Sequence, residues 1–260
     1  MRFNNKTKLI ISVSSNPTNF GVTIYNYIFS KLNLNYVYLP FKSEDEESVI
    51  SSIKNLDIIG CSVSSPLKSK MIKYMDKLDE NTKQLKNLNT IKNFDGELHG
   101  FNTDYFGFKN LIENLDLESA LIYGNGSVAK TILKALNDLG VKEVYLTGRN
   151  SDNIKKFIED NSVKNYSNQS IDLLINATPA GRETNKDEIF KYLDFCKMIV
   201  DLNVTKQDST LVQESRKRNL KVYKGSEMSI NQLRAQFQIY TDILPDEEVF
   251  QEGLQLYFET

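Results

Sequence analysis

Short apolar runs alternate with segments of helical spacing along the first part of the chain. Lys8–Ser14, Tyr36–Leu39 and Asp57–Val63 are rich in β-branched and aromatic residues and predict strands. Thr23–Lys31 and Glu47–Leu56 place apolar residues on one helical face and predict the helices between those strands. This order is the βαβ rhythm of a largely parallel sheet.

A second series of the same kind occupies the later part of the chain. Four short apolar segments predict buried parallel strands: Ser119–Tyr123, Glu143–Thr147, Ile171–Asn176 and Met198–Leu202. A helical pattern over Val128–Leu139 follows the first of them. The second series therefore predicts another α/β unit.

The division between the two series lies in a turn-rich stretch. Asn93–Gly100 is rich in turn residues, and we place the boundary near Asn102–Tyr105. From Gly225 on, the pattern is helical again. We predict an α/β protein of two domains, with residues 1–103 and the C-terminal helices 226–260 forming a substrate-binding and catalytic domain and residues 104–225 forming a nucleotide-binding domain of the Rossmann type.

Composition excludes several classes of partner. The chain has 260 residues and a formal net charge of −2, with both signs mixed along it. We therefore expect neither nucleic acid nor a membrane surface as partner. No apolar run approaches the ~20 residues that span a bilayer, and Met1–Lys8 lacks the apolar core of a signal peptide. We expect a cytoplasmic protein that acts on a small molecule, either as a monomer or as a homodimer.

Cysteine and histidine are scarce. Cys61 and Cys196 form no CxxC pair, and His99 is the only histidine, which we expect in a solvated loop. This content predicts no metal site and disfavours a Ser-His-Asp hydrolase.

A glycine-rich turn follows the predicted strand Ser119–Tyr123. Its sequence fits G-x-G-x-x-[G/A] between a strand and a helix, which is the context that the pattern requires. The first glycine permits a tight turn, the second lets the backbone approach a pyrophosphate, and the helix N-terminus offers N–H groups to the phosphates. A turn without a ligand is the alternative, but this context favours a dinucleotide. The predicted contacts are Gly124, Asn125, Gly126, Ser127, Val128 and Ala129.

The end of the next strand bears on the choice of cofactor. Sites that prefer NAD place an acidic residue there to bind the ribose 2′-hydroxyl. This chain has Arg149 and Asn150 instead, and Arg149 offers a planar, permanently charged group to a 2′-phosphate. A plain surface arginine is the alternative. We predict NADP rather than NAD.

Further polar segments occur in an order that resembles the shikimate dehydrogenase family. That family carries G-x-N-V-T-x-P-x-K, A-V-N-T, G-x-N-T-D-x-x-G, N-A-T-P-x-G-M and G-x-x-M-L-x-x-Q. The corresponding segments here are Gly60–Lys68, Leu88–Thr90, Gly100–Gly107, Asn176–Gly181 and Gly225–Gln232. An ordered series of motifs is far more specific than any single motif.

The resemblance implies roles for particular residues. Lys68 and Asp104 would be the catalytic pair, and Thr178 and Gly225 would join the cofactor site. Oxidation of an alcohol by hydride transfer leaves a hydroxyl proton to move, and a lysine held by a carboxylate is a suitable acid/base unit. An ordinary salt bridge is the alternative. The residues implied to bind substrate, in a cleft between the two domains, are Asn19, Ser64, Asn89 and Gln232.

The departures from the family concern the substrate pocket. The family's S-x-S-P-x-x-H-N, whose serines bind the substrate carboxylate, corresponds here to Asn19–Asn26, which lacks both serines. Ser62 and Ser64 replace the Asn and Thr of N-V-T. The chain thus resembles a divergent shikimate dehydrogenase-like subgroup that keeps the Lys/Asp pair.

The resemblance implies NADP-dependent interconversion of 3-dehydroshikimate and shikimate, within aromatic amino acid and chorismate biosynthesis. A dehydrogenase for quinate or an amino-shikimate is an alternative, as are a non-catalytic NADP-binding regulator and a methylenetetrahydrofolate dehydrogenase. Lys68, Asp104 and Asn89 argue against a regulator, because a pure binder needs no acid/base pair. The segment Asn102-Thr103-Asp104 favours the shikimate family over the folate enzyme.

Overall fold

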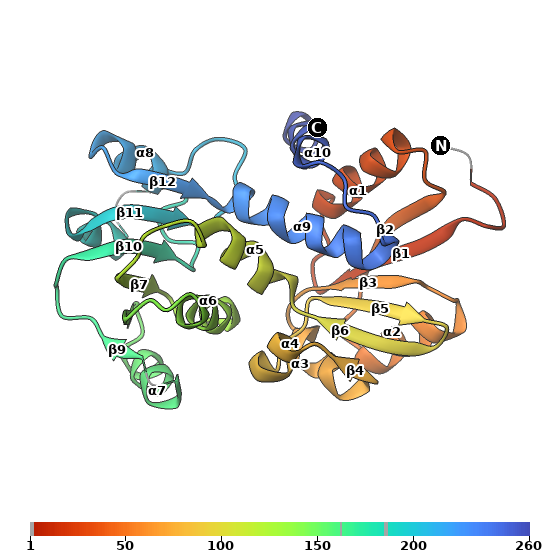
Figure 1. Ribbon diagram of the computed structural model, residues 1–260, viewed down its shortest axis with the longest axis horizontal. Coiled ribbons are helices and arrows are strands. Elements are labelled where there is room, and N and C mark those ends of the chain that lie inside the picture. Colours follow the sequence, from red (N-terminus) through yellow and green to blue (C-terminus); the bar gives the residue numbers. More distant parts are fainter. Residues whose placement is uncertain (1–2, 162, 185–186) are drawn as a thin grey trace. The chain divides into compact units, whose positions relative to one another are not determined.

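The computed structural model describes residues 3–161, 163–184 and 187–260, which divide into two compact units. Unit 1 is Met1–Phe106 with Gln232–Thr260, and unit 2 is Gly107–Asn231. The chain leaves unit 1 within helix α5 (Thr103–Ile112) and returns to it within helix α9 (Gly225–Thr241) (Figure 1). The predicted boundaries after residues 103 and 225 differ from these by a few residues, because the chain crosses between units inside helices rather than in loops.

Unit 1 is built on a mixed six-stranded sheet of order β2-β1-β3-β5-β6-β4. Strands β2, β1 and β3 are parallel, whereas β5 runs antiparallel to both β3 and β6. The strands are β1 (Lys8–Ser14), β2 (Tyr36–Lys42), β3 (Gly60–Val63), β4 (Lys77–Leu78), β5 (Thr90–Phe94) and β6 (Glu97–Phe101). The helices are α1 (Phe20–Lys31), α2 (Glu46–Asn55), α3 (Leu67–Lys70), the 3-10 helix η1 (Met71–Tyr74), α4 (Glu80–Leu85) and α10 (Glu247–Glu259), with the first residues of α5 and the last residues of α9.

The stretch predicted as a turn-rich boundary is a β-hairpin. Strands β5 and β6 are joined by Asp95 and Gly96, which have φ angles of 51° and 98°. Positive φ at both central residues suits the tight turns that connect hairpin strands. His99 therefore lies in a strand rather than in a solvated loop, with its ring Nε2 3.0 Å from Glu97 Oε1. The hairpin adds antiparallel pairings at β5 to a sheet whose β1–β2, β1–β3 and β4–β6 pairings are parallel, as expected of a largely parallel sheet.

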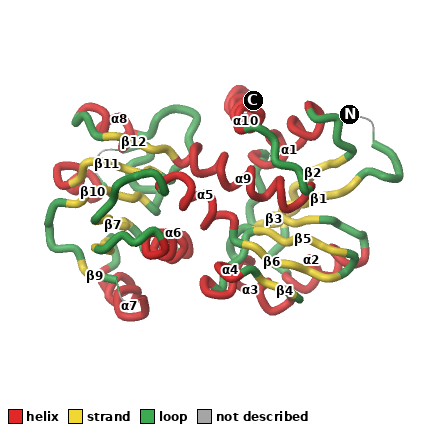
Figure 2. Tube along the Cα trace, viewed as in Figure 1, coloured by secondary structure: helices red, strands yellow, loops and turns green. Residues whose placement is uncertain are grey.

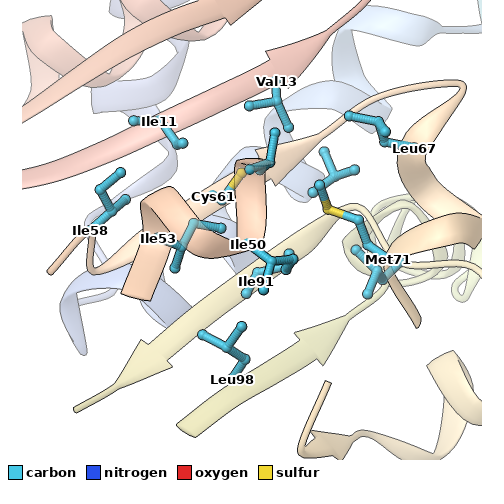
Figure 3. Packing of buried hydrophobic residues seen from close by; sticks show 13 residues of the cluster. Ile11, Val13, Ile50, Ile53, Ile58, Cys61, Leu67, Met71, Ile91 and Leu98 are labelled. Carbon is cyan, nitrogen blue, oxygen red and sulfur yellow. The ribbon is translucent and has the colours of Figure 1, made fainter. Parts of the chain in front are cut away.

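The core of unit 1 forms where α2 and α3 cover the sheet (Figure 3). Asp45 begins α2 because its side chain accepts hydrogen bonds from the N–H groups of Glu47 and Ser48. Ile50 and Ile53 of α2 pack with Ile11, Ile91 and Leu98 from three strands, as Figure 3 shows. Burial of this apolar surface, at about 25 cal/mol per Å², is the main term that holds the helix on the sheet.

Unit 2 has a fully parallel six-stranded sheet of order β12-β11-β10-β7-β8-β9. This arrangement, with the first strand β7 in the middle, is the Rossmann strand order, as predicted. The strands are β7 (Ser119–Tyr123), β8 (Glu143–Thr147), β9 (Lys164–Asn165), β10 (Ile171–Asn176), β11 (Cys196–Asp201) and β12 (Lys221–Lys224). The helices are α6 (Ser127–Asp138), α7 (Ser151–Asn161), the 3-10 helix η2 (Glu188–Phe195) and α8 (Thr210–Lys217), with the remaining parts of α5 and α9.

The strand register brings four loops to one edge of the unit 2 sheet. Tyr123 pairs with Thr147 on one side and Asn176 on the other, and Asn176 pairs with Asp201. The residues that follow these strand ends therefore lie at the carboxyl edge. In open parallel sheets, ligands bind at this edge where the strand order reverses, which here is between β7 and β10.

Figure 2 shows the helices in red beside the yellow strands of each sheet. Most of these helices bury only one side. In α1, for example, Ile24, Tyr25, Ile28 and Phe29 are buried, at the i, i+1, i+4 spacing of one face. No helix in the described ranges is long and apolar enough to cross a membrane.

Candidate active site

A cavity of about 360 Å³ lies in unit 1, at the carboxyl ends of β1 and β3. Its wall also includes the first turn of α1 and the side of α9 that carries Gln232 and Gln236. Serine, threonine, asparagine and glutamine side chains dominate the lining. Among the described residues that line it, Lys68 is the only charged one.

Lys68 and Asp104 form a close ion pair, as the motif order predicts them to do. Lys68 Nζ donates to Asp104 Oδ2 at 2.6 Å, and the two side chains are 18% and 11% exposed. The short helix α3 places Lys68, anchored by buried Leu67 and by a hydrogen bond from Leu88 N–H to the Lys68 carbonyl. Because the pair is mostly shielded from water, its attraction is stronger than that of a surface pair. Lys68 also lines the cavity.

Asn89 is the second partner of Asp104. Its Nδ2 donates to Asp104 Oδ1 at 2.8 Å, while its Oδ1 accepts from the backbone N–H of Thr103 at 2.8 Å. Asp104 also lies in the first turn of α5, where the helix dipole favours a negative charge. The carboxylate is therefore fixed by a cation, an amide and a helix end.

The structure places three of the four predicted substrate residues in the lining. Ser64, Asn89 and Gln232 line the cavity, but Asn19 does not. Asn19 is the exposed residue that precedes α1, and its side chain makes no capping hydrogen bond. Motif counting gave Asn19 the position of a family serine, but the backbone entering α1 turns that side chain toward solvent.

Gln236 lines the cavity but escaped the sequence reasoning. Gln236 Oε1 accepts from Tyr25 Oη at 2.7 Å and from Ser62 Oγ at 3.4 Å, and Ser62 Oγ is 2.9 Å from Tyr240 Oη. The only sequence signal for Gln236 is a polar residue one helical turn after Gln232, on a helix face that otherwise carries Leu233, Phe237 and Tyr240.

Tyr38 fills the space next to Gly21. A Cβ at Gly21 would lie 2.9 Å from Tyr38 Cε1 and 3.0 Å from Tyr38 Oη. A serine at position 21, where the family has one, would therefore meet the tyrosine ring. Burial raises the pKa of Tyr38 to about 12, although the hydroxyls of Ser62 and Ser12 oppose that rise, so the phenol stays protonated.

In unit 2, the predicted glycine turn lies at the carboxyl end of β7. Gly124 has φ 118°, and a Cβ there would lie 2.5 Å from Thr178 Cγ2, so only glycine fits. A Cβ at Gly126 would lie more than 4 Å from every other residue that the structure describes, apart from its chain neighbours. Gly126 and Ser127 are exposed at the start of α6, and Asn125 and Val128 are half-buried beside them. Their N–H groups are therefore accessible to an anion at a helix N-terminus.

The other predicted nucleotide contacts lie along the same edge. Ala129 is fully buried under the turn, as close packing of α6 requires. Thr178 follows β10, and its Oγ1 donates to Asn176 Oδ1 at 2.8 Å. Gly225 begins α9, and a Cβ there would lie 2.4 Å from the Leu202 carbonyl oxygen, so this glycine is required by close backbone approach.

Arg149 and Asn150 follow β8 and differ in their roles. Arg149 is exposed, and no carboxylate of the described residues pairs with it. Asn150 caps α7, because its Oδ1 accepts from Asn153 N–H at 3.0 Å. Arg149 is therefore available to an anionic ligand, whereas the Asn150 side chain already has a structural partner.

Unit 2 also buries an aspartate that sequence reasoning did not single out as a site. Asp201 accepts hydrogen bonds from Asn176 Nδ2, Asn203 Nδ2 and Ser209 Oγ, at 3.0, 2.8 and 2.6 Å. These contacts tie together the ends of β10 and β11 and the start of α8. The described part of the chain contains no group of three or more His, Cys, Asp or Glu side chains suited to a metal ion.

Comparisons with known proteins agree with this arrangement. A sequence profile of the shikimate dehydrogenase substrate binding domain matches residues 17–91. A shikimate dehydrogenase-like protein of Haemophilus influenzae is 28% identical, over 96% of this chain and 96% of its own length. The shikimate dehydrogenase (NADP(+)) of Clostridium beijerinckii is 30% identical, over 91% of this chain and 92% of its own. A solved structure of a shikimate 5-dehydrogenase-like protein has a TM-score of 0.92 and 28% identity, with all of both chains covered. With one relative at 30% identity along nearly its whole length, the chain belongs to the shikimate dehydrogenase family.

Proposed function

We propose that this protein is an NADP-dependent dehydrogenase that interconverts 3-dehydroshikimate and shikimate. The observation that carries the proposal is the Lys68–Asp104 ion pair, 2.6 Å long and set against a cavity without other charged lining among the described residues. An enzyme of this family needs such a pair for the hydroxyl proton, and a protein that only bound a nucleotide would not.

The proton chemistry follows from the pair's surroundings. In the oxidation of an alcohol, the hydroxyl oxygen loses its proton as the carbon loses a hydride. A group within hydrogen-bond reach of that oxygen must accept the proton, and must return it when the ketone is reduced. Lys68 is the only charged residue in the described lining, and Asp104 holds its Nζ by a hydrogen bond. Ser64, Asn89 and Gln232, which also line the cavity, would orient the remaining hydroxyls of the ring.

The carboxyl edge of unit 2 fits a dinucleotide phosphate. The exposed start of α6 at Gly126 and Ser127 would receive the pyrophosphate, and nothing fills the space on the Gly126 Cα. Arg149, which has no carboxylate partner among the described residues, would bind the 2′-phosphate. These residues would bind and orient NADP, which would provide the hydride chemistry when bound.

At the other end of the substrate cavity, Tyr38 would take over the role of a missing serine. Its hydroxyl lies 3.0 Å from the Cβ position of residue 21, which is glycine here. A buried, protonated phenol can donate to a carboxylate, as can the free N–H groups in the first turn of α1. We therefore expect the substrate carboxylate between Tyr38 and the start of α1. This altered end is also the reason to test quinate beside shikimate.

One assay tests the proposal. Purified protein is mixed with shikimate and NADP⁺, and NADPH formation is followed by its absorbance; parallel reactions use quinate and NAD⁺. We expect turnover with shikimate and NADP⁺, with a much lower kcat/KM for NAD⁺. Faster turnover of quinate would reassign the substrate within the same chemistry. A protein that binds NADP⁺ tightly and oxidises neither acid would refute the dehydrogenase proposal in favour of a binding protein.

A further inference from the structure

A continuous path of hydrogen bonds runs from the buried side chain of Tyr25 to Asp104. Tyr25 Oη donates to Gln236 Oε1 at 2.7 Å, and Gln236 Nε2 donates to Thr90 Oγ1 at 2.8 Å. Thr90 Oγ1 then donates to Asn89 Oδ1 at 2.9 Å, and Asn89 Nδ2 donates to Asp104 Oδ1 at 2.8 Å. Every donor along this path points toward the carboxylate.

Backbone groups fix that direction. Gln236 Nε2 also donates to the Asn89 carbonyl at 3.2 Å, and a carbonyl can only accept. Asn89 Oδ1 accepts from the backbone N–H of Thr103 at 2.8 Å, and an N–H can only donate. Neither amide can therefore be turned over without losing these bonds. Thr90 Oγ1 accepts from Gln236 and lies 2.9 Å from Asn89 Oδ1 and 3.3 Å from Thr103 Oγ1, so we assign its proton to the shorter contact, with Asn89.

The path is shielded from water. Tyr25 and Thr90 are fully buried, and Asn89, Gln236 and Asp104 are 2%, 3% and 7% exposed. In such surroundings, hydrogen bonds in series polarise one another, so an amide whose oxygen accepts more bonds becomes a stronger donor. Asn89 Oδ1 accepts from Thr90 and Thr103 together, which strengthens the bond from its Nδ2 to Asp104.

We propose that Gln236 and Thr90 are positioning residues for the reaction. Through Asn89 they hold the Asp104 carboxylate in place, and Asp104 in turn holds Lys68 at the cavity. This inference rests on the proposed function, since turnover is its main readout. Thr90 is absent from the described lining, so it acts on the substrate only by way of Asn89.

The first test compares Thr90→Val with Thr90→Ser. Valine has the shape of threonine without its hydroxyl, whereas serine keeps the hydroxyl. We expect Thr90→Val to lower kcat about tenfold, the effect of losing one hydrogen bond, with KM for shikimate within about twofold of wild type. Thr90→Ser should recover most of the loss. Unchanged kcat in Thr90→Val, or a change confined to KM or to stability, would overturn the inference.

The second test places Gln236→Leu beside Gln238→Leu, the same substitution at an exposed position of the same helix. Gln236→Leu should lower kcat about tenfold, and Gln238→Leu should leave it at the wild-type value. The double variant Thr90→Val/Gln236→Leu should be no slower than the slower single variant, because both act through one path. Multiplied effects would show that the two side chains act separately and would overturn the path.

A third measurement needs no turnover. The side-chain NH₂ resonances of Asn89 are assigned by their loss in Asn89→Asp and followed by ¹⁵N-edited NMR. In Thr90→Val the proton donated to Asp104 should move upfield, and in Thr90→Ser it should stay. If wild type oxidises neither shikimate nor quinate, the proposed function fails while this measurement still decides the path. A resonance that does not move in Thr90→Val would overturn the inference even in an active enzyme.

Discussion

Two buried aspartates, one in each unit, have similar exposure and different surroundings. Asp104 is 7% exposed and Asp201 is 1% exposed. Asp104 is paired with Lys68, which reaches a cavity. Asp201 is held by two amides and a hydroxyl, and no lysine or arginine of the described residues pairs with it.

The difference shows what would allow a buried carboxylate to take part in proton transfer. An amide or a hydroxyl can hold a carboxylate by hydrogen bonds, but it cannot exchange a proton with a substrate near neutral pH. A lysine that reaches a cavity can do so, provided that its charge is compensated. We therefore assign Asp104 to the proposed reaction and Asp201 to the framework. The predictions below test this assignment and the cofactor site that goes with it.

The largest effect is expected from Lys68→Ala. If Lys68 is the acid/base group, as proposed, its removal should lower kcat by about 10³-fold, which corresponds to about 4 kcal/mol in activation free energy. The measurement is steady-state kinetics with shikimate and NADP⁺, together with a thermal melt to show that the variant is folded. Lys70→Ala, an exposed lysine on the same short helix, should keep full activity. If Lys68→Ala retained a tenth of the wild-type kcat, the pair would be only a salt bridge.

Asp201→Ala should instead affect stability. It removes the acceptor of three side-chain hydrogen bonds, two of them from the buried residues Asn176 and Ser209, so we expect a loss of about 3 kcal/mol in the free energy of unfolding. Urea denaturation measures this loss. Asp194→Ala, at a side chain that is 70% exposed, should cost no more than about 0.5 kcal/mol. A stable Asp201→Ala protein with abolished turnover would break the comparison, because it would give Asp201 a role in the reaction.

Arg149→Ala should weaken only the binding of the phosphorylated cofactor. A charge-assisted hydrogen bond contributes about 2 kcal/mol, so KM for NADP⁺ should rise about thirtyfold, while KM for NAD⁺ should stay the same. Lys155→Ala, on exposed α7, is the matched control and should change either value far less. Equal increases for both cofactors would place Arg149 away from the 2′-phosphate.

The smallest effect concerns Asp172, an ion-paired aspartate of unit 2 that faces no described cavity. Burial alone would raise its pKa, but the Lys197 ammonium and the N–H groups of Glu118 and Ser119 outweigh burial and lower it. Since its folded-state pKa is depressed, Asp172 contributes stability above its unfolded pKa of about 4 and loses it as the pH falls through the folded value. Asp172→Asn should cost about 1 kcal/mol at pH 7.

The pH series separates this cost from a packing effect. The stability difference between wild type and Asp172→Asn should stay constant from pH 7 to about pH 5 and should disappear near pH 2. Kinetic constants at pH 7 should be unchanged, because a cation partner without access to a cavity gives no chemistry. A difference that persisted through the acid range would mean that the carboxylate charge is not what stabilises the fold.

The parallel strands were predictable because each is a short apolar segment that needs no distant partner to be recognised. β1, β7, β8 and β10 have the predicted limits. The hairpin of β5 and β6 was missed although Asp95-Gly96 is a common hairpin turn, because the surrounding polar residues looked like a linker. Here burial by neighbouring elements outweighs local polarity: Lys92 and Asn93 of β5 are 8% and 7% exposed.

The site residues could be predicted only where they belong to a recognised sequence motif. Lys68, Asp104 and Asn89 lie together as expected, because their spacing is part of an ordered series. Gln236 could not be found in this way, since its partner Tyr25 is 211 residues away in the sequence. Asn19 is exposed and lies outside the cavity lining, because a motif gives a position in the chain and not the direction of the side chain, so its contact with substrate stays a prediction.

The crossing of the chain within α5 and α9 has a consequence for synthesis on the ribosome. Unit 2 is one continuous segment and is complete once residue 231 has emerged, whereas unit 1 still lacks residues 232–260 at that stage. Domains fold as whole units during translation, so the second unit of this protein can finish before the first. Gln232 and Gln236 belong to this late segment, so the wall of the cavity is incomplete until they have emerged.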